Sequence, residues 1–129
     1  MDAPAVAVSA DGKKIAVAWM DQRTGNNQRD VWWRTAKDGK FGAEAPLHEK
    51  ADGLQAHPAL AIDAKGVVHA AWEDGSEGPT RVMYATSEKK ENVALSGGGR
   101  AGFPALACGP DFIVAVWEQD GVKVRVLGK

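Results

Sequence analysis

Apolar and polar residues alternate with a period of two along much of this chain, which predicts short β-strands. The clearest case is the segment 122–126, Val-Lys-Val-Arg-Val, in which apolar and basic residues alternate strictly, as they do in a strand with one buried face. The 15 glycines are spread along the chain and predict many turns. No window shows the helical spacing of apolar residues over three turns. The sequence therefore predicts an all-β fold.

Three segments repeat the same order of features, and this is the strongest pattern in the sequence. Each opens with Pro-Ala and an apolar stretch, passes a short turn, and enters a second apolar run that ends on tryptophan. The prolines are Pro4, Pro58 and Pro104, and the tryptophans are Trp19, Trp72 and Trp117. The prolines are 54 and then 46 residues apart, and the tryptophans are 53 and then 45 apart. Because two independent markers give the same pair of periods, we interpret them as one internal repeat with an insertion at 22–29 in its first copy.

Each repeat predicts four short strands joined as a meander, with the proline at the start of the first strand, where a missing N–H does least harm. The third strand is expected at 30–35, 81–86 and 122–126, and a weaker fourth at 43–48 and 92–96. No fourth strand is expected in the third repeat. Four antiparallel strands in about 45 residues are typical of a propeller blade. We therefore expect one unit, 1–129, of about three blades at approximately 1–53, 54–100 and 101–129, the last one incomplete.

A β-trefoil is the alternative architecture, because it also has three repeats of about 40 residues. Three blades alone would leave open edges and faces, which soluble proteins avoid. The meander within each repeat nevertheless favours blades. A propeller then requires either a longer parent chain or two copies of this one, so a homodimer that completes the ring is the expected partner arrangement.

The repeat also predicts which side chains pack between blades. Trp19, Trp72 and Trp117 occupy equivalent positions and are expected to form the core between neighbouring sheets. Cys108 aligns with Val8 and Ile62 in the first strand, so it is expected to be a small buried hydrophobe. His69 lies among apolar residues of a second strand and is expected to be a satisfied core or wall histidine rather than a ligand.

Charge and composition exclude several classes of protein. Lys and Arg total 16 and Asp and Glu total 17, for a net charge of -1, so the basic excess of a nucleic-acid-binding protein is missing. No apolar run is long enough to span a membrane. The single cysteine excludes an intrachain disulfide and a cysteine-built metal site, and the three histidines have no metal-binding spacing. We expect no metal and no cofactor. The first residues show no signal peptide.

Two motifs carry a resemblance to a known family. Residues 19–25, Trp-Met-Asp-Gln-Arg-Thr-Gly, followed by Asp-Val-Trp at 30–32, resemble the W-x-D-x-R-x-G…D-I-Y pattern of sialidase-like propeller repeats. Residues 35–41, Thr-Ala-Lys-Asp-Gly-Lys-Phe, resemble a shortened Asp-box, also called a BNR repeat. The second repeat keeps Trp-Glu-Asp at 72–74 but has Lys89-Lys90 where the Asp-box has Asp-Gly.

The resemblance to the sialidase-like superfamily covers nearly the whole chain and implies half of a six-bladed ring and a secreted or periplasmic location. Sialidases of this superfamily use an arginine triad, a Tyr–Glu pair and an aspartate. This chain has one tyrosine, Tyr84, placed mid-strand, and no F/Y-R-I-P motif, so a complete centre cannot be assembled. The expected function is a non-catalytic binding or assembly module for a glycan or a protein partner. The alternatives are a fragment of a sialidase-like glycoside hydrolase, with its catalytic residues mostly outside this chain, and a trefoil lectin.

The densest charged cluster is the candidate binding site. It comprises Asp21, Arg23, Arg29 and Asp30, in the loop between the second and third strands of the first repeat. One interpretation is a polar ligand site. The other, which we favour, is a loop held by Asp–Arg pairs and Asx turns.

Overall fold

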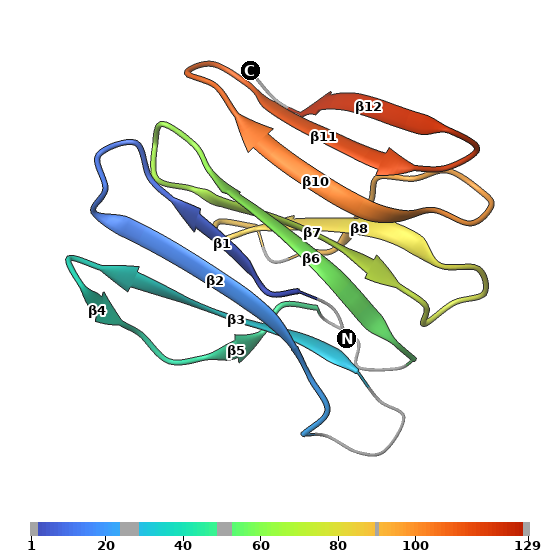
Figure 1. Ribbon diagram of the computed structural model, residues 1–129, viewed down its shortest axis with the longest axis horizontal. Coiled ribbons are helices and arrows are strands. Elements are labelled where there is room, and N and C mark those ends of the chain that lie inside the picture. Colours follow the sequence, from blue (N-terminus) through green and yellow to red (C-terminus); the bar gives the residue numbers. More distant parts are fainter. Residues whose placement is uncertain (1–2, 24–28, 49–52, 90, 128–129) are drawn as a thin grey trace.

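The computed structural model describes residues 3–23, 29–48, 53–89 and 91–127, and these form three antiparallel sheets without a helix (Figure 1). The first sheet contains β1 (Ala5–Val8), β2 (Lys14–Asp21), β3 (Asp30–Lys37), β4 (Lys40–Phe41) and β5 (Ala45–Pro46). The second contains β6 (Gln55–Ile62), β7 (Val68–Asp74), β8 (Arg81–Thr86) and β9 (Val93–Ala94). The third contains β10 (Gly102–Cys108), β11 (Ile113–Glu118) and β12 (Val122–Leu127). The all-β prediction is confirmed.

Each sheet is built from strands that follow one another in the sequence, as in a blade. The strand order is β6-β7-β8-β9 in the second sheet and β10-β11-β12 in the third. In the first sheet β4 and β5 both pair with β3, at different points along it, and together they form the outer strand. Among the described residues no strand of one repeat pairs with a strand of another, and no barrel closes. The trefoil alternative is therefore wrong for this part of the chain.

The prolines of the second and third repeats do not lie where the sequence placed them. Pro58 lies inside β6 and Pro104 inside β10, not at the strand starts. Each follows a residue with a positive φ, His57 at 50° and Phe103 at 51°, and the ladder shifts register at both points. A β-bulge takes the proline out of the hydrogen-bonded ladder, which is why the strand continues on both sides of it.

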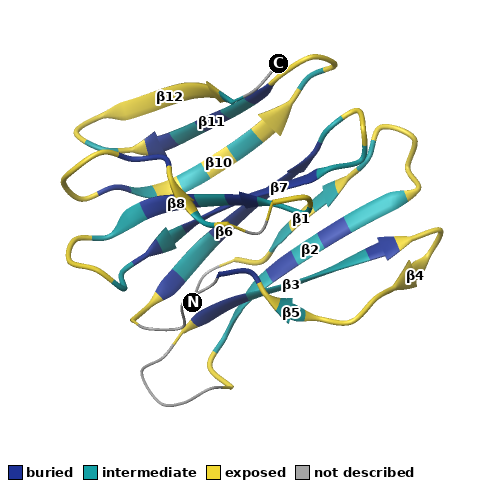
Figure 2. Cartoon of the chain, turned by 180° about the vertical axis from the view of Figure 1, so that it is seen from behind, coloured by how far each residue is buried: buried dark blue, intermediate teal, exposed yellow. Residues whose placement is uncertain are grey.

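The core lies between the sheets, in two clusters (Figure 2). Trp72 packs between the first and second sheets and Trp117 between the second and third, with 1% and 6% of their surfaces exposed. This confirms two of the three expected core tryptophans. Trp19 is only half-buried, because its side of β2 has no preceding sheet against it.

Two further predictions have opposite outcomes. The prediction that Cys108 is buried is wrong: it is exposed at the end of β10, where its Sγ donates to the carbonyl of Ile62 at 2.7 Å. Ile62 is buried against the first sheet, whereas Cys108 ends its strand and is not among the core residues between the second and third sheets. His69 is a buried histidine with both ring nitrogens satisfied, as expected. Its Nε2 lies 2.8 Å from Asp63 Oδ2 and its Nδ1 lies 2.5 Å from the Tyr84 hydroxyl.

Candidate functional site

A cleft of about 500 Å³ lies between the second and third sheets, at the end where the two β-bulges occur. We call it the 57–103 cleft. The second sheet supplies His57, Glu73 and Thr80, and the third repeat supplies most of the remaining lining. The residues from the third repeat are Arg100, Ala101, Gly102, Phe103, Glu118, Gln119, Asp120, Gly121 and Val122. The cleft thus combines one exposed aromatic ring with charged and amide side chains.

The bulges aim the two ring-bearing residues of the cleft at each other. Residues other than glycine rarely adopt a positive φ, and each residue in this conformation costs about 1–3 kcal/mol of folding free energy. His57 and Phe103 both adopt it at equivalent repeat positions. Their ring centroids are 4.7 Å apart with planes tilted by 40°. Strain of this kind clusters at binding and catalytic sites, and here it presents the Phe103 ring, which is 60% exposed.

Glu73 links the two bulges. Its Oε2 accepts a hydrogen bond from the backbone N–H of Phe103 at 2.7 Å and lies 2.7 Å from His57 Nδ1. Gly102 makes room for this carboxylate, because a Cβ there would come within 2.8 Å of the same oxygen. The Glu73 side chain is largely buried, at 14% exposed, so its position is fixed by both sheets.

Gln119 holds the opposite wall. Its Oε1 accepts from Trp117 Nε1 at 3.1 Å, and its Nε2 donates to the carbonyl of Gly98 at 2.8 Å. These bonds tie the glycine-rich segment before β10 to the end of β11. Arg100 follows that segment and is exposed in the cleft. The arrangement can bind a hydroxylated ligand by stacking on Phe103 and by charge-assisted hydrogen bonds to Glu73 and Arg100.

The site expected from the sequence is only partly assembled. Asp21 and Arg23 form an ion pair, with 2.6 Å between Asp21 Oδ2 and Arg23 Nη2, and Arg23 also pairs with Glu44. The hydrogen bond from Arg23 holds the pKa of Asp21 at about 2, well below its ordinary value of 3.8. The Arg23 guanidinium lies 4.2 Å from the centre of the Trp32 ring, a cation–π contact.

The other two members of that cluster have different surroundings. Asp30 is buried, and its Oδ1 lies 3.5 Å from Nε2 of the buried His48. Arg29 is exposed, and its backbone carbonyl accepts from the N–H of Gln55 at 2.8 Å. The Asp–Arg pairing predicted for this loop is confirmed for Asp21 and Arg23. Ligand binding by the cluster stays a prediction.

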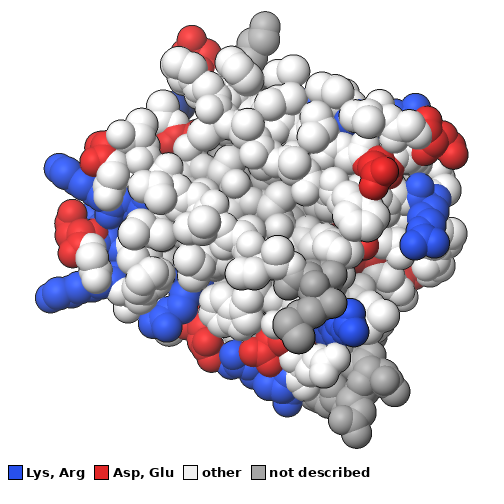
Figure 3. All heavy atoms as spheres, in the orientation of Figure 1, with Lys and Arg blue, Asp and Glu red and all other residues white. Residues whose placement is uncertain are grey.

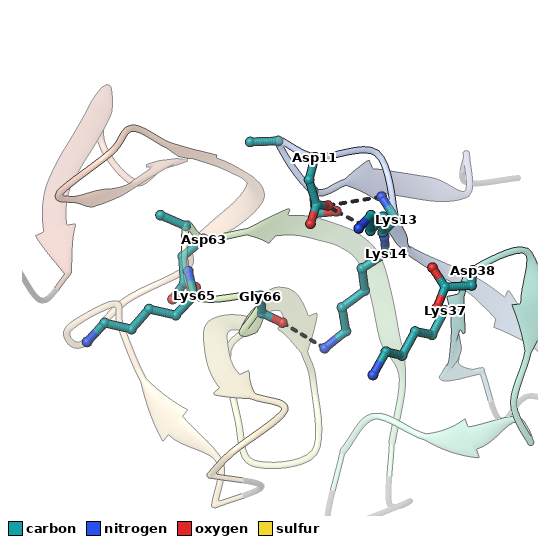
Figure 4. Close-up of a pocket in the computed structure, with 11 residues that line it drawn as sticks. Asp11, Lys13, Lys14, Lys37, Asp38, Asp63, Lys65 and Gly66 are labelled. Carbon is teal, nitrogen blue, oxygen red and sulfur yellow. Dashed lines mark hydrogen bonds between the residues drawn. The ribbon is translucent and has the colours of Figure 1, made fainter.

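Two more hollows lie beside the turns between first and second strands, at the end of the sheets away from the 57–103 cleft. One, of about 580 Å³, has Lys13, Lys14 and Lys37 from the first repeat facing Asp63 and Lys65 of the second (Figure 4). Figure 4 also shows Lys14 Nζ donating to the carbonyl of Gly66, at 2.7 Å. Its acids are largely used within the turns, since the N–H groups of Lys65 and Val67 donate to Asp63. The other, of about 370 Å³, lies between the second and third repeats.

Among the described residues no group of three His, Cys, Asp or Glu side chains could hold a metal ion. That same part of the chain contains no helix that could cross a membrane.

Sequence reasoning missed the 57–103 cleft. In the sequence, His57 is one of three histidines without metal-binding spacing, Glu73 belongs to the Trp-Glu-Asp motif at 72–74, and Phe103 belongs to no motif; none of these patterns predicts a cleft. The available signal was a ring-bearing residue directly before proline in two repeats, His57-Pro58 and Phe103-Pro104. This signal alone does not predict the cleft, because the bulges that bring the two rings together depend on contact between sheets.

No family model and no curated protein matches this chain. Its fold does match solved structures, among them a fucose lectin from Kordia zhangzhouensis in complex with methyl-fucoside. That match has a TM-score of 0.55 at 14% sequence identity, and it covers 98% of this chain and 92% of the lectin chain. At this identity the likeness shows a shared all-β arrangement of sheets.

Proposed function

We propose that this chain is a non-catalytic carbohydrate-binding unit that holds a neutral glycan in the 57–103 cleft. The observation that carries the proposal is the Phe103 ring, exposed beside the buried Glu73 carboxylate and the Arg100 side chain. A sugar has an apolar C–H face and a polar rim of hydroxyl groups. The ring suits the face, while the carboxylate and guanidinium suit the rim.

The charge of the cleft favours a neutral sugar. Its lining includes Glu73, Glu118 and Asp120 against Arg100 and the His57 ring. A sugar that carries a carboxylate, such as sialic acid, would meet a surplus of negative charge at short range. The expected ligand class therefore differs from the substrates of the sialidase-like superfamily, even though the fold is proposed to be theirs.

The surrounding assembly completes the proposal. The three sheets are taken as three blades of a sialidase-like propeller, and two copies of the chain as the homodimer that closes it. The fold shared with a fucose lectin in complex with methyl-fucoside supports the glycan-binding proposal and suggests fucose-containing glycans as the first candidates.

A glycan array followed by calorimetric titration with methyl-fucoside tests this function. The expected result is binding to neutral, fucose-containing oligosaccharides and little binding to sialylated ones. Glu73→Gln should weaken methyl-fucoside binding by about 10- to 100-fold, the worth of a charge-assisted hydrogen bond. Glu88→Gln is the matched control, because Glu88 is exposed beyond the far end of β8. No binding to any neutral glycan, or equal affinity of the Glu73→Gln protein, would reject the proposal.

A further inference from the structure

The two outermost sheets each leave one apolar side uncovered. On the first sheet this side, here the β1 face, carries Val6, Val8, Ile15, Val17 and Trp19, which the strand register places together. On the third sheet the corresponding side, here the β12 face, carries Val114, Val116, Val122, Val124 and Val126. Among the described residues, half of the exposed large hydrophobic residues are valines of these two faces.

The internal repeat shows what the β12 face lacks. Val31, Val82 and Val122 occupy equivalent positions, opposite Met20, Glu73 and Glu118 in the strand register. Val31 is covered by the second sheet and Val82 by the third, and both are 0% exposed, whereas Val122 is 72% exposed. The same side chain at the same position is thus buried wherever a following sheet exists.

The β1 face lacks the opposite neighbour. Val6 is equivalent to Leu60 of the second repeat, two residues after the Pro-Ala proline. Leu60 is 8% exposed because it packs on the first sheet, whereas Val6 is 66% exposed. Trp19 is likewise half-buried where Trp72 is buried. Each end face is therefore one half of an interface that the chain forms twice within itself.

We propose that two copies of this chain join end to end, β1 face on β12 face, and that each junction forms a second glycan cleft from Phe103 and Glu118 of one copy and Asp21 and Arg23 of the other. Within the chain, β6 packs on β1 and β2, and β10 packs on β6 and β7. By the same rule β1 of the second copy lies over β10 and β11 of the first. Exposed apolar patches of this kind mark interaction sites, and the repeat identifies the occupant as another copy.

The new cleft follows from the same equivalence, and it rests on the proposed function of the 57–103 cleft. There, His57 and Glu73 come from the preceding sheet, and Gln119 and Arg100 from the following repeat. At the junction Phe103 takes the place of His57, Ala3 that of Phe103, Glu118 that of Glu73, and Asp21 that of Gln119. Phe103 and Glu118 also line the 57–103 cleft, so they lie between the two sites. Arg23 supplies the cation, because it is paired with Asp21 and stacked on Trp32, the register partner of Trp19 on the β1 face.

Each end face carries charge beside its apolar residues, since Arg34 is opposite Val17 on the β1 face and Glu118 is opposite Val122 on the β12 face. In the space-filling view, Lys, Arg, Asp and Glu lie mostly around the margin of the molecule and leave its middle largely uncharged (Figure 3). On β12 the charged side chains Lys123 and Arg125 alternate with the valines and so point to the other side of the strand. Two junctions between two copies leave no end face uncovered, which closes the assembly.

Sedimentation velocity at micromolar concentration tests the pairing. The wild-type protein should be a dimer, and Val124→Asp should be a folded monomer by circular dichroism. Val93→Asp is the matched control: it is the same substitution at an exposed valine, but on the outer strand of the middle sheet, and it should stay a dimer. A monomeric wild-type protein, or an undiminished Val124→Asp dimer, would overturn the proposal.

Cross-linking keeps the test decisive if Val124→Asp fails to fold. In a Cys108→Ser background, Val6→Cys and Val116→Cys proteins are prepared separately and then mixed under oxidising conditions. End-to-end pairing predicts a mixed disulfide and no self-linked dimer of either variant. Self-linked dimers without a mixed product would show that like faces meet, and would reject the arrangement.

Counting methyl-fucoside sites by calorimetry tests the second cleft. The dimer should bind two molecules per chain, and the Val124→Asp monomer one. Arg23→Ala should remove one site while leaving the dimer intact. Equal site numbers in the wild-type and monomeric proteins would reject the junction cleft. If no variant binds methyl-fucoside, the glycan half of the proposal fails, while sedimentation and cross-linking still decide the pairing.

Discussion

The carboxylate of Glu73 in the second sheet accepts a hydrogen bond from the backbone N–H of Phe103 in the third, across 2.7 Å. The same oxygen lies 2.7 Å from His57 Nδ1. One buried carboxylate thus joins two strained bulges and two sheets. Because the ring of Phe103 is oriented by this contact, the acid that would bind a sugar hydroxyl also positions the surface on which the sugar would stack.

Gly102→Ala tests whether the Glu73 carboxylate must keep its position for binding. The added Cβ would come within 2.8 Å of Glu73 Oε2, so the carboxylate must move, and it can do so because it ends a flexible side chain. We expect methyl-fucoside affinity to fall by about tenfold or more, the cost of one charge-assisted hydrogen bond. The unfolding free energy should fall by at most about 3 kcal/mol, because the hydrogen bond from the Phe103 N–H to Glu73 is weakened or lost. Calorimetry and urea denaturation measure the two quantities.

Gly42→Ala is the control for that substitution. Its added Cβ would meet the carbonyl of Thr35 at an ordinary 3.7 Å, so neither affinity nor stability should change appreciably. Wild-type affinity in the Gly102→Ala protein would show that the position of the Glu73 carboxylate is irrelevant to binding.

Truncation of Trp72 should be far more costly than truncation of Trp19. Trp72 is 1% exposed between two sheets, and loss of a buried aromatic side chain costs about 3–5 kcal/mol. Trp19 is half-buried on an uncovered face, so in the Val124→Asp background its replacement by alanine should cost clearly less. Urea denaturation of both variants measures the difference. Equal losses would mean that the first sheet is covered within a single chain.

The Asp21–Arg23 pair should make a pH-dependent contribution to stability. The hydrogen bond from Arg23 lowers the pKa of Asp21 to about 2 from 3.8, so the folded protein binds this proton less readily than the unfolded chain. The stabilisation is present above about pH 4 and is lost as the pH falls towards 2. Carboxyl NMR should show an Asp21 midpoint near pH 2 that rises towards 3.8 in the Arg23→Ala protein. A midpoint unaffected by the substitution would disprove the pairing.

Cys108 should react with a thiol reagent in the native protein. It is exposed at the end of β10, where its Sγ donates a hydrogen bond to the Ile62 carbonyl. Ellman's reagent should therefore label one thiol per chain without denaturant. Labelling that requires unfolding would place the residue in the core after all.

The sequence predicted the sheets better than the site. Repeated spacing of proline and tryptophan indicated three blade-like units, because burial between sheets imposes the same side chain at each repeat. It misjudged Cys108, which lies exposed at the end of β10 although the second sheet precedes it. It misjudged Trp19 because alignment assigns equal burial to positions whose neighbouring sheets differ. Whether a sheet has a neighbour depends on its place in the stack, which a pattern within one repeat does not contain.

The 57–103 cleft depends on features that periodicity does not report. A positive φ before Pro58 and before Pro104 follows from bulges, and the bulges are fixed by the carboxylate of Glu73 reaching across to the next sheet. The charged cluster at Asp21 was visible because its members are close in sequence. The residues of the cleft come from segments that only the packing of two sheets brings together.

The most direct measurement is an NMR titration of the ¹⁵N-labelled protein with methyl-fucoside. Binding in the 57–103 cleft predicts the largest changes at the backbone amides of Gly102, Phe103 and Gln119. The amide signals of the hollow beside Lys14 and Gly66, at the other end of the sheets, should stay unchanged. Changes confined to that hollow, or no change at millimolar sugar, would contradict glycan binding in the cleft.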